Sequence, residues 1–423
     1  MKRFVKIYTY WLLGILLFTG CDDYLKEDSG DLLIPGKVEE FLPMLYREGF
    51  PRNFNDEVAW LYLMTDDVEM GQLELDPDDE SYETRDKNSL DALSAGEGEE
   101  PYKWEREIKS YADNFWERRY GNILACNLVI DALPEMVYVE ADSGSYNFLA
   151  AQAYAMRAYH YWCLVNSYAL PWSEENLDKP GVIIRTEPQI DISARGRSSI
   201  RDVYDLINED IEKAERYIKV ATFDGNIHRL SEPAILLLAS RIALFQENWD
   251  EVIRTGELFL AQNSVILNLN DQDTTLFGKE RGTGTEPFTM MDGVKNKEIV
   301  FTFGTSSYFP YQYLSTSGAL YGLGFRPSHS TEKSLIRSYE EGDLRKKAYF
   351  LKDIPAKKAE YWWEDDKPYE YKYYYPIKYR QLSSSTSAKP SENLFHENWR
   401  SVEVMLNLAE AYVRKNNEVT SDA

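Results

Sequence analysis

Residues 151–168, AQAYAMRAYHYWCLVNSY, combine closely spaced alanines with aromatic residues one helical turn apart. Small side chains on one face of a helix let a second helix approach closely, because the distance between two helix axes depends on the side chains at the contact. The stretch therefore predicts a helix packed among other helices, in a mostly α fold. The pattern begins just upstream and includes Ala150, Ala151, Ala153, Ala155 and Ala158.

Helical periodicity continues on both sides of this stretch. Residues 104–133 predict a long amphipathic helix, or a broken pair, that Pro134 stops. Another helix is expected to begin with Ser198 or Ser199 as its N-cap, because a serine hydroxyl there accepts a hydrogen bond from a free backbone N–H. Residues 402–413, VEVMLNLAEAYV, predict a final helix.

Residues 230–263 predict two consecutive helices, with Ser231 as the N-cap of the first and Asn248 at the turn between them. We expect Ala239 here, and Ala409 in the final helix, to lie at close helix contacts. The spacing is typical of tetratricopeptide helix pairs, which place small and large residues at fixed positions. Here those positions are occupied by Ser240, Ala243, Trp249, Val252 and Phe259.

The amino-acid composition changes between residues 278 and 391, where Gly, Ser, Thr and Tyr dominate. Residues 298–304, EIVFTFG, alternate as a strand does. Residues 76–100 form a second polar, irregular excursion. The sequence thus predicts a helical scaffold over about 104–262 and 399–417 that carries a loop-rich mixed region with short strands. Recognition residues are concentrated on such loops.

The N-terminus reads MKRFVKIYTYWLLGILLFTGCDD, with basic residues, a short apolar core and small residues before Cys21. This is the order of a secretory signal peptide, and its core is far shorter than the roughly 20 residues of a membrane-spanning helix. LLFTGC resembles a lipobox, so we expect residues 1–20 to be removed and 21–35 to form a lipidated leader. An ordinary signal peptide with a chance cysteine is the alternative.

Composition excludes one large class of partner. The 423 residues include 71 acids and 47 bases, which give a formal net charge of -24. Such a chain repels the phosphate backbone of nucleic acids, so no nucleic-acid partner is expected. Cys126 and Cys163 could form one disulfide, but both lie in apolar helical patterns that favour free core cysteines. No CxxC or HExxH spacing predicts a metal, and no cofactor motif occurs.

Taken together, the segments resemble the SusD/RagB family of outer-membrane lipoproteins of Bacteroidetes. The likeness covers nearly the whole chain, and its motifs follow the order of the family. One departure is that the chain stops at Ala423, soon after the last helix, so its C-terminus looks short for the family. The motifs are GCDDYL, WERRYGNILACNLVID, AQAYAMRAYHYWCLVNSYALP, KPGVIIRTEP, SSIRDVYDLINEDIEKA, NKEIVFTFG, RPSHS, GDLRKKAYF and WRSVEVMLNLAEAY.

The resemblance implies one SusD-like domain over residues 36–423 and a non-catalytic, surface-exposed nutrient binder. Such a protein captures an oligosaccharide, or in some members a peptide, and delivers it to a SusC-like TonB-dependent transporter. The outer membrane would hold it through the lipid, palmitate included, on Cys21. We expect Arg157 and Asp210 to be structural, because both lie in dense helical patterns. For His160, in its Ala-rich helix, we expect a packed or a rim role.

The expected ligand site lies on the loop-rich face, where flat rings can stack on sugars and polar groups can read hydroxyls. Tyrosines of residues 308–321 are rivalled by the aromatic cluster of residues 361–375, which includes Trp362 and Trp363. Packing of the tyrosine segment onto the helices, or against the transporter, is the other explanation. The predicted ligand-binding residues are Asp67, Arg85, Trp104, Tyr308, Tyr311, Tyr313 and Tyr321.

Three other classes of function fit less well. A glycoside hydrolase needs two carboxylates about 5 to 9.5 Å apart, and adjacent pairs such as Asp66 and Asp67 say nothing about such a pair across a cleft. No GxSxG nucleophile elbow occurs. Calcium could use oxygens of residues 268–275, NLNDQDTT, but EF-hand spacing is missing and a solvated turn is favoured. A pure tetratricopeptide adaptor would not need the aromatic loops or the lipid.

Overall fold

The structure is a computed structural model. The structure describes residues 37–51, 64–70, 99–106, 115–136, 138–189, 193–277, 290, 293, 296–303, 325–328, 331–351, 375–376 and 397–421. The expected signal peptide and lipidated leader lie outside the described residues.

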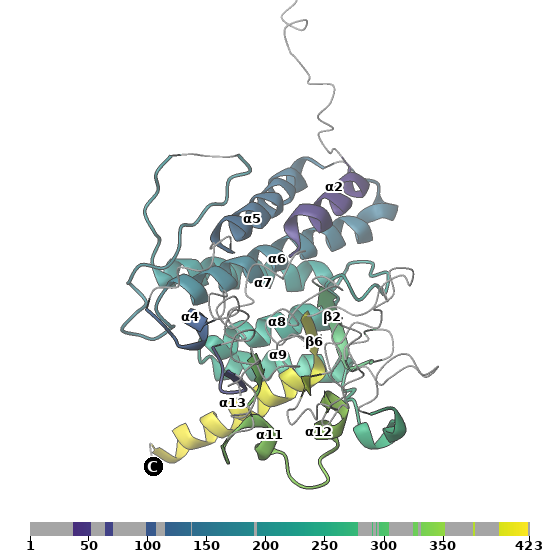
Figure 1. Ribbon diagram of the computed structural model, residues 1–423. Coiled ribbons are helices and arrows are strands. Elements are labelled where there is room, and N and C mark those ends of the chain that lie inside the picture. The colour runs from purple at the N-terminus through teal and green to yellow at the C-terminus, as the bar shows by residue number, and fades with distance from the viewer. Residues whose placement is uncertain are drawn as a thin grey trace, which may run out of the picture.

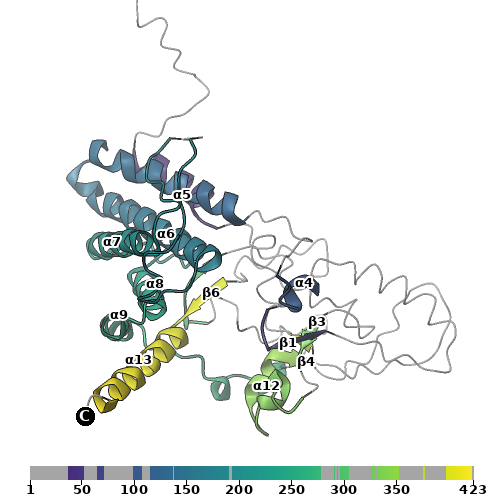
Figure 2. The same cartoon turned by 90° about the vertical axis from the view of Figure 1, so that its left-hand side faces the viewer.

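The helices form one continuous body (Figure 1). Figure 2 shows α5 to α9 and α13 arranged in succession, with α4, α12 and the short strands to one side. The mostly α, helical-pair fold expected from the sequence is confirmed. The helices of the body are α2 (Val38–Met44), α5 (Phe115–Ala132), α6 (Ser143–Tyr168), α7 (Ile200–Ile218), α8 (Glu232–Phe245), α9 (Trp249–Gln262) and α13 (Ser401–Ser421).

Three helices begin where the sequence predicts. Ser199 caps α7 by accepting a hydrogen bond from the backbone N–H of Asp202, whose carboxylate accepts from the Ser199 N–H in return. Ser231 caps α8 and Asn248 caps α9, each by accepting a hydrogen bond from a backbone N–H with its side-chain oxygen. Each cap satisfies a donor that the first helical turn leaves free, which stabilises a helix by about 1 kcal/mol.

α6 lies at the centre of the scaffold and packs against both α5 and α7. Its five pattern alanines are fully buried, and Tyr161 and Leu164 are buried beside them. Small residues on one side and aromatic residues on another let α6 contact neighbours around most of its circumference. This explains why residues 151–168 show little amphipathic contrast.

A buried ion pair joins α6 to α7. Arg157 donates two hydrogen bonds of 2.7 Å to the carboxylate of Asp210, and the latter side chain is fully buried. A third bond, of 3.0 Å, runs from Arg157 to the amide oxygen of Asn127 on α5. Asn127 then donates to the carbonyls of Arg185 and Glu187. The structural role predicted for Arg157 and Asp210 is confirmed.

α13 packs against α8 and α9 through one of its two apolar sides. Ala411 and Leu408 face inward, and a methyl group at Gly256 of α9 would meet Leu408 Cγ at 2.5 Å. Ala239 of α8 is buried as expected, with 3% exposure. The prediction for Ala409 was wrong, because this residue is exposed on the outer side of α13.

An antiparallel strand pair connects the start of α13 to the core. β2 (Ile299–Phe303) is the strand predicted from EIVFTFG, and it pairs with β6 (Glu397–Arg400). Phe301 packs edge-on against Trp399 with ring centroids 4.9 Å apart, and Tyr159 of α6 lies 5.6 Å from the same tryptophan. Aromatic contacts of this kind stabilise by about 0.5–1.5 kcal/mol beyond their buried area.

The elements beside the scaffold are short. β1 (Val68–Met70) pairs antiparallel with β3 (Phe325–Pro327), and β4 (Phe350–Leu351) pairs with β5 (Tyr375–Pro376). Three short helices accompany them: α4 (Glu99–Tyr102), α11 (Leu335–Ser338) and α12 (Leu344–Tyr349). This agrees with the loop-rich, mixed texture of the sequence.

Several local expectations are settled by the described residues. Cys126 and Cys163 are both free. Residues 268–276 form two hydrogen-bonded 3₁₀ turns, in which Asn268 and Asp273 accept from backbone N–H groups. Pro180 forms one isolated antiparallel bridge with Ser199. None of the helices within the described ranges combines the length and apolarity needed to cross a bilayer.

Candidate functional site

The structure describes two of the seven predicted ligand-binding residues. Trp104 follows α4 and Asp67 directly precedes β1, and both of these elements lie on the side of the scaffold that carries the short elements (Figure 2). The other five fall outside the described residues, namely Arg85, Tyr308, Tyr311, Tyr313 and Tyr321.

Trp104 terminates the short helix α4 rather than starting a long one. The N–H of Trp104 donates to the carbonyl of Pro101, and the N–H of Glu105 donates to the carbonyl of Glu100, both at 3.0 Å. These two bonds define a Schellman motif, whose C′ residue adopts the left-handed conformation and is usually glycine. Trp104 occupies that position with φ 55°.

The backbone at Trp104 is therefore strained by its own side chain. For a residue with a Cβ the left-handed conformation costs roughly 1–2 kcal/mol, and a bulky residue there is a genuine outlier. The indole is 66% exposed, so burial of the ring returns little of this cost. Strain of this kind persists at ligand-binding sites. The motif holds a large flat ring out in solvent.

Asp67 is held by its backbone while its side chain stays exposed. Its carbonyl accepts a 2.8 Å hydrogen bond from the N–H of Ser328, and the carbonyl of Asp66 accepts one of equal length from the Ser328 hydroxyl. The same hydroxyl accepts from the N–H of Leu335 at the start of α11. Ser328 thus fixes the turn before β1, and the Asp67 carboxylate is free to accept hydrogen bonds from solvent or a ligand.

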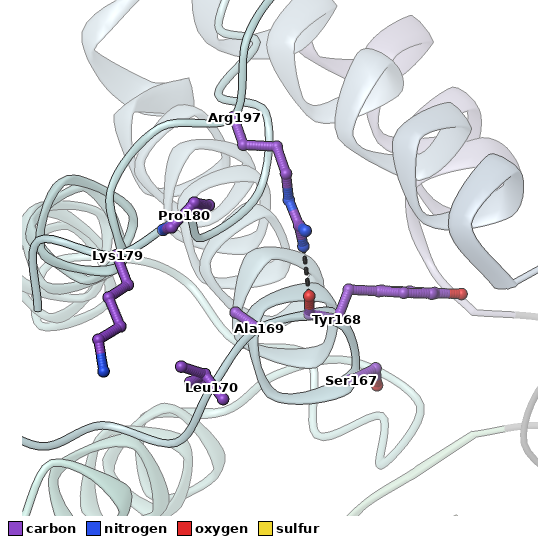
Figure 3. A pocket seen from close by; sticks show the side chains of 7 residues that line it. All are labelled: Ser167, Tyr168, Ala169, Leu170, Lys179, Pro180 and Arg197. Carbon is purple, nitrogen blue, oxygen red and sulfur yellow. Dashed lines mark hydrogen bonds between the residues drawn. The ribbon is translucent and has the colours of Figure 1, made fainter. Parts of the chain in front are cut away.

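A second feature is a hollow of about 620 Å³ at the C-terminal end of α6. In Figure 3 Lys179 and Arg197 approach it from opposite sides of Pro180. This hollow could not be predicted from sequence, because its two cations are 18 positions apart in a connecting segment and share no local motif. Its lining residues are Ser167, Tyr168, Ala169, Leu170, Lys179, Pro180 and Arg197.

Each cation of the hollow is held by a neutral oxygen. Arg197 donates from Nη2 to the backbone carbonyl of Tyr168, the last residue of α6. Lys179 donates from Nζ to the amide oxygen of Asn176 at 2.7 Å, and the buried Asn176 is itself anchored to the carbonyl of Pro171. Both positive groups therefore have fixed directions while much of each side chain remains in solvent.

The backbone around the hollow is closely packed. A methyl group at Gly181 would lie 3.0 Å from the carbonyl oxygen of Ser199 and 3.1 Å from that of Ser198. The N–H of Gly181 donates to the Ser198 carbonyl at 2.7 Å, and Ser198 donates to the carbonyl of Val182 at 2.9 Å. Only glycine allows these two backbone segments to approach this closely, and the pairing of the segments fixes Lys179 relative to Arg197.

His160 is a core residue, so of the two expected roles it has the packed one. Its ring is fully buried between Arg119 and the carbonyl of Gly49. Arginine can only donate and a carbonyl can only accept, so Nδ1 accepts from Arg119 and Nε2 carries the proton donated to Gly49. Burial, with repulsion from Arg119 as the second cause, lowers the pKa of His160 to about 3. A neutral, enclosed imidazole with these partners is structural.

Two sequence comparisons identify proteins to which this chain is similar. Residues 52–244 match the SusD-like_3 family model, described as "Starch-binding associating with outer membrane". A SusD-like protein of Formosa agariphila is 26% identical over 158 residues, which are 37% of this chain and 27% of that protein. The matched segment thus spans about a quarter of that relative.

Solved structures share the fold over most of the chain. A SusD superfamily protein of Bacteroides thetaiotaomicron superposes with a TM-score of 0.59 at 16% identity, over 91% of this chain and 78% of the other. A laminarin-binding SusD-like protein gives 0.55 at 14% identity, over 89% and 79%.

The helical-pair scaffold with a loop-rich side thus has the architecture of the SusD superfamily. In sequence, the chain is similar to SusD-like proteins through the family model that residues 52–244 match and through the relative from Formosa agariphila.

Proposed function

We propose that this chain is a non-catalytic lipoprotein of the cell surface that captures an oligosaccharide and delivers it to a SusC-like TonB-dependent transporter. The starch-binding description of the matched family and the laminarin-binding neighbour support a glycan as the ligand. The observation that carries the proposal is Trp104, an exposed ring that the backbone holds at a cost in energy.

A sugar presents flat faces of C–H groups edged by hydroxyls, so it pairs well with an indole face and nearby polar acceptors. Trp104 supplies the face, and Asp67 supplies an exposed carboxylate on the same side of the scaffold. Arg85 and the tyrosines of residues 308–321 complete the proposed site.

Calorimetry on the soluble chain from residue 22 onward tests the binding site. The probes are maltohexaose and laminarihexaose, which represent the starch and laminarin named for the relatives. Trp104→Ala should weaken binding of the preferred probe by roughly 1–3 kcal/mol, about 5- to 150-fold in Kd, by analogy with stacking of bases on aromatic side chains. Trp104→Phe, which keeps a ring, should recover much of that loss.

Tyr138→Ala serves as the matched control, because this tyrosine is 42% exposed and stacks on Tyr146 of the scaffold. It should bind as the wild type does. Equal affinities for wild type and Trp104→Ala, with unchanged circular dichroism, would place the site elsewhere. Binding of a peptide library instead of either glycan would favour the peptide-binding alternative.

The anchor and the partner need experiments in cells. Metabolic labelling with an alkyne fatty acid should mark the wild type and miss Cys21→Ser, and equal labelling of both would exclude lipidation at this residue. Protease shaving of intact cells tests exposure at the surface. Affinity capture of the lipidated protein from detergent-solubilised outer membranes should co-purify a TonB-dependent transporter.

A further inference from the structure

We propose that the hollow at the end of α6 is a second ligand site, which binds an acidic substituent of an oligosaccharide, a carboxylate or a sulfate ester, between Lys179 and Arg197. That the acidic group belongs to a glycan rests on the proposed function. The preference for an anion rests on the hollow alone.

The two cations keep unused donors. Arg197 has five N–H groups and gives one hydrogen bond to the Tyr168 carbonyl, while Lys179 has three and gives one to Asn176. Since both remain fixed by these bonds, a ligand would not have to order two free side chains. Holding flexible side chains in place in advance of binding removes about 0.5–1.5 kcal/mol of entropic cost for each.

Neither cation is neutralised by a carboxylate among the described residues, although the chain has a net charge of -24. The acid next to Lys179 in sequence, Asp178, is engaged by Arg201 at 3.3 Å. Elsewhere in the described structure arginines commonly pair with acids, as do Arg157, Arg195, Arg229, Arg241, Arg254, Arg345 and Arg414. Two cations without acid partners in one hollow therefore mark a place where an external anion is favoured.

The rest of the lining suits a sugar ring rather than a bare ion. Leu170 is 50% exposed, and Pro180 and Ala169 extend the apolar lining between the cations. The volume of about 620 Å³ falls in the range of about 300–1,000 Å³ that small-molecule sites occupy. Apolar lining with charged groups on both sides matches a pyranose ring that carries a carboxylate or a sulfate.

The competing explanation is structural. The last carbonyls of a helix carry partial negative charge, so cations near the end of α6 stabilise the helix by about 0.3–1 kcal/mol each. Arg197 satisfies this explanation directly, because it donates to the Tyr168 carbonyl. Lys179 donates to Asn176 instead. A purely structural role predicts a lower melting temperature on substitution and no effect on any ligand.

The experiment compares matched ligands that differ only in charge. Calorimetry on the soluble chain uses hexagalacturonate against its methyl ester, and sulfated against desulfated neocarrahexaose, at 50 mM salt. The acidic member of at least one pair should bind at least tenfold more tightly than its neutral counterpart. The first pair reports on carboxylates and the second on sulfate esters.

The variant is K179Q/R197Q, and the matched control is R216Q/K219Q, which removes the same charge from exposed residues near the end of α7. The first should abolish the preference for the acidic member, and the second should change affinity less than twofold. Melting temperatures of both variants show whether the fold is intact. If the K179Q/R197Q chain fails to fold, the single variant Lys179→Gln, which leaves the α6 cap in place, should still lose at least threefold.

The outcomes separate the two proposals. Equal binding of acidic and neutral members, or an acidic preference that survives both K179Q/R197Q and Lys179→Gln, overturns the site at the hollow. A neutral glucan that binds through Trp104 while the acidic preference is missing leaves the proposed function standing and removes only this inference. Acidic preference that depends on Lys179, with no neutral glucan bound, supports the hollow and refutes the role of Trp104.

Discussion

The buried His160 should make the scaffold sensitive to acid, and His160→Gln should remove that sensitivity. The neutral imidazole accepts from Arg119 through Nδ1 at 3.2 Å and donates to the Gly49 carbonyl through Nε2 at 2.8 Å. Glutamine offers one acceptor and one donor group in the same side chain, so it can make both bonds, and it does not titrate. The substitution therefore isolates the ionisation of this ring.

The size of the effect follows from the two pKa values. Burial and Arg119 lower the pKa of His160 in the folded protein to about 3, and the unfolded chain has about 6.5. The unfolded state thus binds more protons between these values, so stability is fully present above pH 6.5 and is lost as the pH falls towards 3. At pH 4.5 the loss is about 3 kcal/mol relative to pH 7.5.

Urea denaturation of both proteins at pH 7.5, 6.0, 5.0 and 4.5 measures this loss. All other titrating groups are shared, so the difference in unfolding free energy between His160→Gln and wild type should move in favour of the variant by about 3 kcal/mol across this range. A difference that stays constant with pH would refute the reasoning. It would mean that the folded state accommodates a charged imidazole next to Arg119.

Three further mutational tests concern the packing of the scaffold. Asp210→Leu should cost about 3–5 kcal/mol in urea denaturation by leaving Arg157 buried without its partner, and adding Arg157→Leu should recover part of the loss. Ala239→Arg should destabilise the fold severely, because Ala239 is buried. Ala409→Arg should change the free energy of unfolding by no more than about 0.5 kcal/mol, because its position is exposed. Equal melting temperatures for the two variants would contradict the orientations of α8 and α13. Gly256→Ala should cost about 1–3 kcal/mol, since the added methyl meets α13 at 2.5 Å, and an unchanged melting temperature would show that α13 moves aside.

Local signals were sufficient to predict most of the scaffold. The cap at Ser231 and the choice between Ser198 and Ser199 were read from sequence, because a capping hydrogen bond joins residues three apart, whereas Asn248 was predicted only as a turn residue and proves to be a cap as well. The alanines of α6 likewise predict a close helix contact, but they do not indicate which helix makes it. What these signals leave open is which neighbouring helix each face meets.

α13 shows why such a choice fails. This helix has two apolar stripes at helical spacing, and periodicity cannot rank them. The structure buries one stripe against α8 and α9 and leaves most of the other exposed, so Ala409 was assigned to the wrong side. The inward stripe consists of Val404, Leu408 and Ala411, and the outer one of Val402, Leu406, Ala409 and Val413.

In the candidate sites, too, local sequence indicates some features, whereas others depend on tertiary contacts. Trp104 was found from sequence as an aromatic residue beside a polar loop, but its left-handed backbone was not, because YKWE contains none of the residues that favour that conformation. Lys179 and Arg197 were not found at all. Their proximity depends on the pairing of Gly181 with Ser198, which is a tertiary contact without a sequence pattern.

A chain with a net charge of -24 can nevertheless bind an acidic ligand at the hollow. The repulsion comes from carboxylates spread over the surface, and at 0.1 M salt the field of an exposed charge is screened beyond about 10 Å. A ligand in the hollow instead meets Lys179 and Arg197 at hydrogen-bonding distance, where screening is weak and charge-assisted hydrogen bonds are about twice as strong as neutral ones. Salt up to the physiological range therefore reduces the distant repulsion more than the local attraction. Stacking on Trp104 has no such dependence, so the two sites differ in their physics as well as in their position.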